Sequence, residues 1–168
     1  MTETAYIALG SNLGDRMAAI ESAVEALRAT AGVHDLVLSD VIETLPVGPT
    51  LQGRYYNAVV RFQTTLSPRR LLRRCQQIEA EHGRDRDNEQ RWGPRPLDLD
   101  LLLYGDSVIN EPGLTVPHPS MHERDFVLRP LAQIDPGAVH PVLKATAEGL
   151  LENLPRQTEM KYAAGSRR

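Results

Sequence analysis

The stretch Arg91-Trp-Gly-Pro-Arg-Pro-Leu-Asp-Leu-Asp-Leu-Leu-Leu-Tyr104 alternates between leucine and aspartate in its second half. Because every second residue of a strand points to the same side, we expect Asp98 and Asp100 to project side by side from a β-strand. At a rise of ~3.3 Å per residue, their stems would lie about 7 Å apart. The opposite, buried face would carry Leu97, Leu99, Leu101 and Leu103.

Two aspartates on one face of a strand repel each other, and aspartate is depleted in strands. A divalent cation with oxygen ligands would remove this conflict. The alternative is a solvated outer face of an edge strand. The arginines and the tryptophan at 91–96 favour a metal site over this alternative. Carboxylates can bind a cation and nearby arginines can bind phosphate, and chemistry on a nucleoside polyphosphate needs both.

The composition is that of one globular domain. The chain has 168 residues, of which 41% are hydrophobic and 24% charged, enough to bury a core. Its net charge of −3 argues against a dedicated binder of nucleic acid or anionic membranes, so an anionic ligand needs a local basic cluster. The chain has a single Cys75, no signal peptide at residues 1–6 and no apolar run of membrane-spanning length, so we expect a cytoplasmic protein. We also expect a monomer.

Hydrophobic periodicity predicts the order strand, helix, strand, strand, helix, strand. The predicted strands cover 4–9, 33–44, 55–65 and the Asp98/Asp100 segment, and the helices cover 13–27 and 68–83. Ser67 is a typical N-cap, Pro68 a typical first helical residue and Gly83 a typical C-terminal cap. This order predicts an α+β, ferredoxin-like split βαβ fold, a mainly antiparallel sheet with both helices on one face.

After Tyr104 the chain is rich in proline and harder to assign. A small strand at 108–109 and helices at 123–133 and 145–154 would cover the second face of the sheet and give a three-layer α/β/α sandwich. We expect a single domain over 1–156, followed by a polar, flexible tail at 157–168.

The loop at 84–96 is the main candidate for binding phosphate. Its arginines are Arg84, Arg86, Arg91 and Arg95. Each guanidinium can grip phosphate oxygens in a fork. The alternative is a solvated loop whose arginines pair with its own acids, although its length is more typical of a functional loop. Trp92 could be a stacking lid or a core residue.

Three further positions carry candidate ligand-binding groups. Tyr55 and Asn57 share a strand face and pair a stacking ring with an amide, as a flat heterocycle needs, although an exposed polar face is equally consistent. Glu79 borders the buried stripe of its helix. An ordinary flanking charge is the simpler interpretation, and the alternatives are pairing with an arginine or positioning of a ligand. Gly10–Gly14 lacks the lysine of a P-loop, and no paired Cys/His spacing suggests zinc.

Five segments in the same order resemble those of the 6-hydroxymethyl-7,8-dihydropterin pyrophosphokinase family of folate biosynthesis. They are Tyr6-Ile-Ala-Leu-Gly-Ser-Asn-Leu-Gly14, Tyr55-Tyr-Asn-Ala-Val59, Gly83-Arg-Asp-Arg86, Arg91-Trp-Gly-Pro-Arg-Pro-Leu-Asp-Leu-Asp100 and Thr115-Val-Pro-His118. The resemblance implies transfer of the β,γ-pyrophosphate of ATP to the pterin hydroxymethyl group, which releases AMP. Pro119 and Asp125 depart from the family pattern, and Asp125 puts a negative charge near the site.

The resemblance also implies roles for individual residues. Two Mg²⁺ ions would be held by Asp98 and Asp100. The catalytic set would be Arg84, Arg86, Arg95, Asp98 and Asp100. The ATP site would comprise Glu79, Arg84, Arg86, Arg95, Leu101, Thr115, His118 and Arg124. The pterin site would comprise Gly10, Thr44, Leu45, Val47, Tyr55, Asn57, Trp92 and Phe126. The partners would then be these two small molecules.

Two other functions remain open from the residues alone. A two-metal phosphohydrolase would give the pyrophosphate to water instead of a pterin. A ferredoxin-like RNA-binding module would need exposed aromatics and a basic face, whereas aromatics make up 5% of this chain and its net charge is negative.

Overall fold

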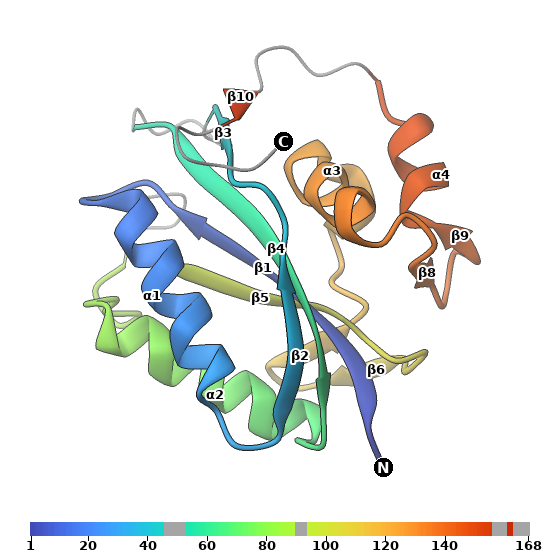
Figure 1. The fold of residues 1–168 in the computed structure, drawn as a ribbon, viewed down its shortest axis with the longest axis horizontal. Coiled ribbons are helices and arrows are strands. Elements are labelled where there is room, and N and C mark those ends of the chain that lie inside the picture. The colour runs from blue at the N-terminus through green and yellow to red at the C-terminus, as the bar shows by residue number, and fades with distance from the viewer. Residues whose placement is uncertain (46–52, 90–93, 156–160, 163–168) are drawn as a thin grey trace.

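The computed structural model describes residues 1–45, 53–89, 94–155 and 161–162 (Figure 1). In chain order, the elements are β1 (Glu3–Ser11), α1 (Arg16–Arg28), β2 (Val33–Leu38), β3 (Ile42–Thr44), β4 (Tyr55–Thr64), α2 (Pro68–Glu81), β5 (Asp98–Tyr104), β6 (Ile109–Glu111), β7 (Leu114–Val116), the 3₁₀ helix η1 (Met121–Glu123), α3 (Asp125–Ile134), β8 (Val139–His140), β9 (Ala145–Thr146), α4 (Ala147–Glu152) and β10 (Lys161–Tyr162).

The main sheet has the strand order β10-β3-β4-β1-β5, and β2 also pairs with β4. All of these pairings are antiparallel. Helices α1 and α2 lie on one face of the sheet, and α3 and α4 lie on the other (Figure 1). The predicted α+β ferredoxin-like fold and its three-layer arrangement are therefore confirmed.

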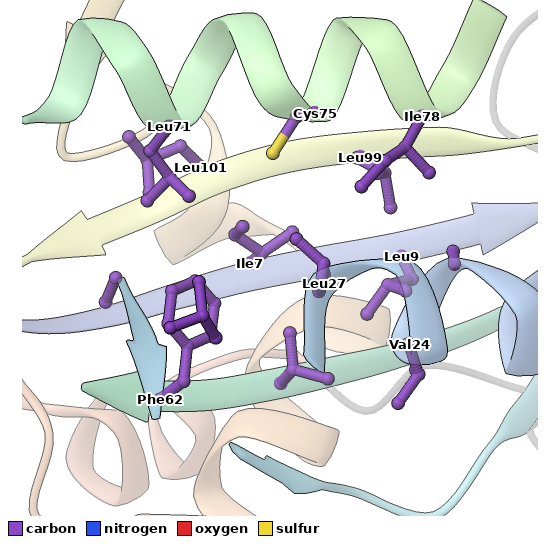
Figure 2. Close-up of a cluster of buried hydrophobic side chains, with 14 of the residues drawn as sticks. Ile7, Leu9, Val24, Leu27, Phe62, Leu71, Cys75, Ile78, Leu99 and Leu101 are labelled. Carbon is purple, nitrogen blue, oxygen red and sulfur yellow. The ribbon is translucent and has the colours of Figure 1, made fainter. Parts of the chain in front are cut away.

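The first face of the sheet is covered along its length by α1 and α2. Asp15 caps α1 by accepting from the Ala18 N–H at 3.0 Å, and Ser67 caps α2 by accepting from the Arg70 N–H at 3.3 Å. Figure 2 shows apolar side chains of both helices meeting those of β1, β4 and β5. This first core cluster includes Ile7, Leu9, Val24, Leu27, Phe62, Leu71, Cys75, Ile78, Leu99 and Leu101.

The second face is covered only in part. A second core cluster joins α3, α4 and η1 to the sheet through Tyr6, Val59, Leu102, Met121, Val127, Leu131 and Ala147. The Tyr6 hydroxyl also donates to Asp135 Oδ2 at 2.5 Å, which ties β1 to the end of α3. Burial and Asp135 raise the pKa of Tyr6, so this proton stays on the tyrosine. The part of this face near Gly10 lies outside the second cluster.

The predicted single strand at 33–44 is wrong, because the chain forms β2 and β3 with a break at Ser39. Ser39 lies opposite Val59, and its hydroxyl accepts from the Val59 N–H at 2.9 Å in place of a backbone carbonyl. The Asp40 N–H in turn donates to Gln133 of α3 at 2.7 Å. The Ser39 N–H still donates to the Val59 carbonyl at 2.9 Å, so side-chain hydrogen bonds replace only part of the backbone ladder, and periodicity cannot reveal this change.

The predicted face of Leu103 is also wrong. The β1–β5 register pairs Tyr6 with Leu103 and Ile7 with Leu101, so Leu102 is an extra residue at a β-bulge. Beyond the bulge the alternation is reversed, and Leu102 and Leu103 both belong to the second core cluster. The alternation predicted for 97–101 holds.

The C-terminal third also differs in detail from the prediction. The helix predicted over 145–154 begins only at Ala147, because Ala145–Thr146 pairs with β8 and Thr146 then caps α4 by accepting from the Gly149 N–H at 3.1 Å. A β6–β7 hairpin replaces the single small strand expected at 108–109. Lys161 and Tyr162 pair with β3, while the boundary between a domain at 1–156 and a tail remains a prediction. Within the described ranges, none of the helices has the length and apolarity needed to cross a membrane.

Candidate functional site

A pocket of about 340 Å³ opens on the second face of the sheet. It is lined by Ala8, Leu9, Gly10, Thr44, Leu45, Tyr55, Asn57, Ala58, Arg95, Asp98, Asp100, His118, Arg124, Phe126 and Val127. The pocket thus lies where residues of β1, β3, β4, β5 and α3 meet. The segment just before α3 also contributes residues to it. Eleven of the predicted site residues lie in this one pocket.

The two aspartates of β5 project into the pocket beside small residues of β1. Asp98 pairs with Gly10, and Asp100 pairs with Ala8, in the β1–β5 ladder. Because glycine has no side chain and alanine has a small one, they leave space beside the two carboxylates at the floor of the pocket. The side-by-side placement predicted from the alternation of aspartate and leucine is present in the structure.

Asp100 is poorly compensated in the protein alone. Burial, and next the neighbouring Asp98, raise the pKa of Asp100 to about 7, and Arg124 only partly counteracts this. His118 Nε2 lies 4.0 Å from Asp100 Oδ2, but burial and Arg124 lower the pKa of His118 to about 4, so this imidazole is neutral at pH 7. Among the described residues, the charge of an ionised Asp100 is therefore only partly compensated.

This shortage of positive charge fits a hard divalent cation. Carboxylate oxygens are suitable ligands, and Mg²⁺ commonly takes only one or two of them and completes its shell with water and substrate phosphates. In the part of the chain that is described, no group of three or more His, Cys, Asp or Glu side chains could form an all-protein cage. Asp98 and Asp100 are thus suited to a metal shared with a phosphate ligand.

Asp98, in contrast, is held by buried arginine. Arg84 Nη1 donates to Asp98 Oδ1 at 2.7 Å and to Glu79 Oε2 at 2.5 Å, and Arg84 Nε donates to Glu89 Oε2 at 2.7 Å. Burial would lower the pKa of Arg84, but the surrounding carboxylates outweigh it and raise the pKa. Only 3% of the Arg84 side chain is exposed. This guanidinium therefore holds Asp98 in position from behind the pocket.

Glu79 is a buried partner of arginines, not an ordinary flanking charge. It is 1% exposed and also accepts from the Leu99 N–H at 2.8 Å and from Arg86 at 2.5 Å. Burial raises the pKa of Glu79, although these donors counteract it. Its carboxylate joins α2 to the start of β5 and does not line the pocket. The simpler interpretation of its sequence position was therefore wrong.

Arg95 reaches the pocket and is fixed at its backbone. Its N–H donates to Asn12 Oδ1 at 2.7 Å, and its carbonyl accepts from the Asn12 N–H at 3.1 Å. Its guanidinium lies 3.3 Å from Asp98 and 3.1 Å from Glu89. Asn12 belongs to the Gly-Ser-Asn turn but was not predicted from the sequence to be a site residue. Glu89 was considered only as one of the acidic residues of the loop at 84–96.

The other end of the pocket offers aromatic rings and an amide. Asn57 Nδ2 donates to Thr44 Oγ1 at 2.7 Å, while Asn57 Oδ1 lies directly over Gly10, 3.2 Å from where a Cβ would stand. Burial raises the pKa of Tyr55, so its phenol remains protonated. Phe126 lies at the rim, with the Arg124 guanidinium 5.7 Å from its ring centre. This region can hold a flat, polar-edged ring.

Several predicted site residues do not line the pocket. Leu101 is buried in the first core cluster, and Thr115 is exposed on β7. Arg86 is half-exposed and lines a separate depression with Arg84 and Glu79. Val47 and Trp92 lie outside the described residues.

The unexpected charge of Asp125 is neutralised locally. Its side chain is buried, and its carboxylate accepts from Arg129 Nη2 at 3.1 Å, one turn further along α3. Asp125 does not line the pocket. The departure from the family pattern at this position therefore adds no free negative charge to the site.

Comparisons with known proteins agree on one family. The sequence model of 7,8-dihydro-6-hydroxymethylpterin-pyrophosphokinase (HPPK) matches residues 6–136. The 2-amino-4-hydroxy-6-hydroxymethyldihydropteridine pyrophosphokinase of Haemophilus influenzae is 45% identical over 138 residues, which cover 82% of this chain and 85% of that protein. The enzyme of the same name from Bacillus subtilis is 49% identical over 134 residues, 80% of this chain and 79% of that one.

A solved structure shares the fold. The crystal structure of Plasmodium falciparum HPPK-DHPS wild type with STZ-DHP matches with a TM-score of 0.71 over 90% of this chain and 43% of that one. The sequence identity is 16%, so this similarity concerns the fold alone.

Proposed function

The chain belongs to the 7,8-dihydro-6-hydroxymethylpterin-pyrophosphokinase family, and we propose that ATP is its donor and Mg²⁺ its metal. It is a diphosphotransferase of folate biosynthesis that transfers a pyrophosphoryl group to the hydroxymethyl group of the dihydropterin. The observation that supports the proposal is the opening of Asp98 and Asp100 into the same pocket as Tyr55 and Asn57.

Asp98 and Asp100 would hold the magnesium together with the ATP phosphates. Bound there, the metal would neutralise phosphate charge and align the β-phosphorus with the pterin hydroxyl. Arg84 fixes the Asp98 carboxylate from behind, so one ligand is already oriented before substrate binds. No described residue donates a comparable hydrogen bond to Asp100, and its ionised form is the one that a cation favours.

Arg95 would grip the phosphates from the side of the pocket. Its backbone is clamped by Asn12, so the guanidinium starts from a fixed base. A planar guanidinium can hold two phosphate oxygens at once and offset the charge that develops during transfer. Arg84 and Arg86 would contribute charge from behind the pocket, with Arg84 also shared among Glu79, Glu89 and Asp98.

The pterin would lie at the other end of the pocket. Asn57 offers its amide to the polar edge of the pterin, and Tyr55 and Phe126 provide rings for stacking. Gly10 has no side chain, which lets Asn57 and Tyr55 lie close to its backbone. We further propose that the enzyme acts as a monomer, and that it is cytoplasmic, which fits its single, buried and unbridged Cys75.

Release of AMP tests the reaction. We expect AMP only when ATP, Mg²⁺ and the pterin are all present, and Asp100→Asn should lower turnover about 100-fold or more, through loss of about 3 kcal/mol of charge stabilisation. Asp106→Asn, which changes an exposed aspartate after β5, is the matched control and should keep full activity.

Two outcomes would contradict the proposal. AMP formed as fast without pterin as with it would favour the phosphohydrolase over the pyrophosphokinase. Full activity of Asp100→Asn would exclude its carboxylate from binding the metal.

A further inference from the structure

Arg16, the first residue of α1, turns away from its helix and binds the sheet. Its Nη1 donates to the Arg54 carbonyl at 2.9 Å, and its Nη2 donates to Glu43 Oε2 at 3.1 Å. Its guanidinium carbon also lies 3.8 Å from the centre of the Tyr56 ring. One side chain therefore joins the end of β3 to the start of β4.

The helix itself does not account for an arginine at this position. The first turn of α1 contains no acidic residue, and the carboxylate of the N-cap Asp15 accepts from the Ala18 N–H. A cation near a helix N-terminus is unfavourable, because the macrodipole places partial positive charge there. The contacts of Arg16 must therefore be explained by what they do for β3 and β4.

Those strands present the candidate pterin-binding groups on their opposite face. The register pairs Glu43 with Tyr56 and Thr44 with Tyr55. Because neighbouring residues of a strand point to opposite faces, Glu43 and Tyr56 face α1, whereas Thr44 and Tyr55 face the pocket. Arg16 thus binds one side of a strand pair whose other side lines the pocket.

The strand that Arg16 binds is short and lies between β4 and the two-residue strand β10. β3 is only three residues long, and the hydrogen bond from Asn57 to Thr44 depends on its staying paired with β4. The planar guanidinium of arginine can stack on a ring while its forked N–H groups donate to two acceptors, whereas the ammonium of lysine is a compact point charge without this geometry. A planar guanidinium is therefore the group that this junction needs.

We infer that Arg16 is a positioning residue for pterin binding, which holds Thr44, Tyr55 and Asn57 in place without touching the substrate. The inference rests on the proposed function, in which these three side chains bind the pterin. It concerns one substrate only, because the residues proposed to bind phosphate and metal are on β5 and the segment before it.

Isothermal titration with the dihydropterin tests this role, with Mg²⁺ and a non-hydrolysable ATP analogue present. We expect Arg16→Met to weaken pterin binding about 10-fold, Arg16→Lys to fall between it and the wild type, and affinity for the ATP analogue to change less than about twofold. Arg28→Met is the matched control, since Arg28 is also on α1 but forms an exposed ion pair with Glu25 at 3.4 Å. It should bind both ligands like the wild type.

Glu43→Gln provides an independent variant of the same junction. If Arg16 acts through Glu43, the double variant should bind the pterin no worse than Arg16→Met alone. Additive losses would overturn this link. Unchanged pterin affinity in Arg16→Met, or equal weakening of both ligands together with a loss of stability, would overturn the positioning role.

Asn57→Ala separates failure of this inference from failure of the proposed function. If Asn57→Ala binds the pterin like the wild type, the assignment of the pterin site is wrong. If Asn57→Ala loses the pterin while Arg16→Met retains it, the pterin site stands and the role of Arg16 is refuted.

Discussion

The two faces of the sheet use the same strands for different purposes. Toward α1 and α2, the strands β1, β4 and β5 bury a continuous apolar cluster (Figure 2). On the opposite face, α3 and α4 cover one part, and the rest is a pocket lined by carboxylates, an amide and aromatic rings. Because adjacent residues of a strand point to opposite faces, stability and chemistry alternate along one strand.

This division shows how a small domain can hold an unfavourable group. Asp100 is ionised only at a cost, whereas its neighbours Leu99 and Leu101 are buried in the first core cluster. The apolar face thus stabilises a strand whose polar face is left uncompensated for a ligand. Substitutions on the two faces should therefore have opposite signatures, with loss of stability on one and loss of function on the other.

The two phenylalanines give the largest expected contrast. Phe62 is fully buried in the first core cluster, and Phe62→Ala should lower the free energy of unfolding by about 3–5 kcal/mol. Phe126 is half-buried at the pocket, and Phe126→Ala should cost about 1–2 kcal/mol of stability but weaken pterin binding about 10-fold. Urea unfolding and pterin titration measure the two effects, and equal stability losses would break the contrast between the faces.

Substitution of Arg95 should slow the chemical step without weakening pterin binding. Its guanidinium faces Asp98 and Glu89, so Arg95→Ala should slow the chemical step about 10- to 100-fold and change pterin affinity less than about twofold. Single-turnover rates compared with pterin titration test this. Arg73→Ala, at an exposed position of α2, is the control. A large loss of pterin affinity with an unchanged chemical step would assign Arg95 to the pterin instead.

The two aspartates should differ in their effect on stability. The pKa of Asp100 is raised to about 7 in the folded protein, so ionising it destabilises the fold as the pH rises from about 4 to about 7, and the cost stays constant above that. Asp100→Asn removes this cost. We expect Asp100→Asn to raise the free energy of unfolding by about 1–2 kcal/mol at about pH 8 and by progressively less toward about pH 4. This expected gain is small because 36% of the Asp100 side chain is exposed to solvent, which screens its charge.

Asp98→Asn should have the opposite sign. It removes one partner of the buried Arg84, so we expect a loss of about 1–2 kcal/mol at about pH 8. Urea unfolding of both variants in chelator, beside the Asp106→Asn control, makes the comparison. If Asp100→Asn destabilised the protein at high pH, the expectation that the ionised Asp100 carboxylate destabilises the fold would be wrong.

The sequence predicted what depends on local pattern and missed what depends on distant partners. Alternation located Asp98 and Asp100 on one face, and apolar spacing predicted α1 and α2. Neither could show the bulge at Leu102, which depends on how β1 pairs with β5, or the break at Ser39, which depends on the Val59 N–H.

The same limit applied to the candidate site. Arg84 was predicted to bind phosphate because of its charge, yet its burial against Glu79 and Asp98 depends on the packing of α2 against β5. Glu79 looked like an ordinary surface charge for the same reason. The contact of Arg16 with Glu43 spans 27 positions and leaves no local signal.

The smallest expected effect is at Gly10, over which Asn57 and Tyr55 lie closely. A Cβ there would stand 3.2 Å from Asn57 Oδ1 and 3.6 Å from Tyr55 Cδ1, so Gly10→Ala should displace both and weaken pterin binding about 3- to 10-fold. Unfolding free energy should change by less than about 1 kcal/mol, because the clash lies on the open face. Gly137→Ala is the control, since its Cβ would come no nearer than 3.9 Å to Asp135. If Gly10→Ala binds the pterin with wild-type affinity, the floor beside Asn57 does not shape that site.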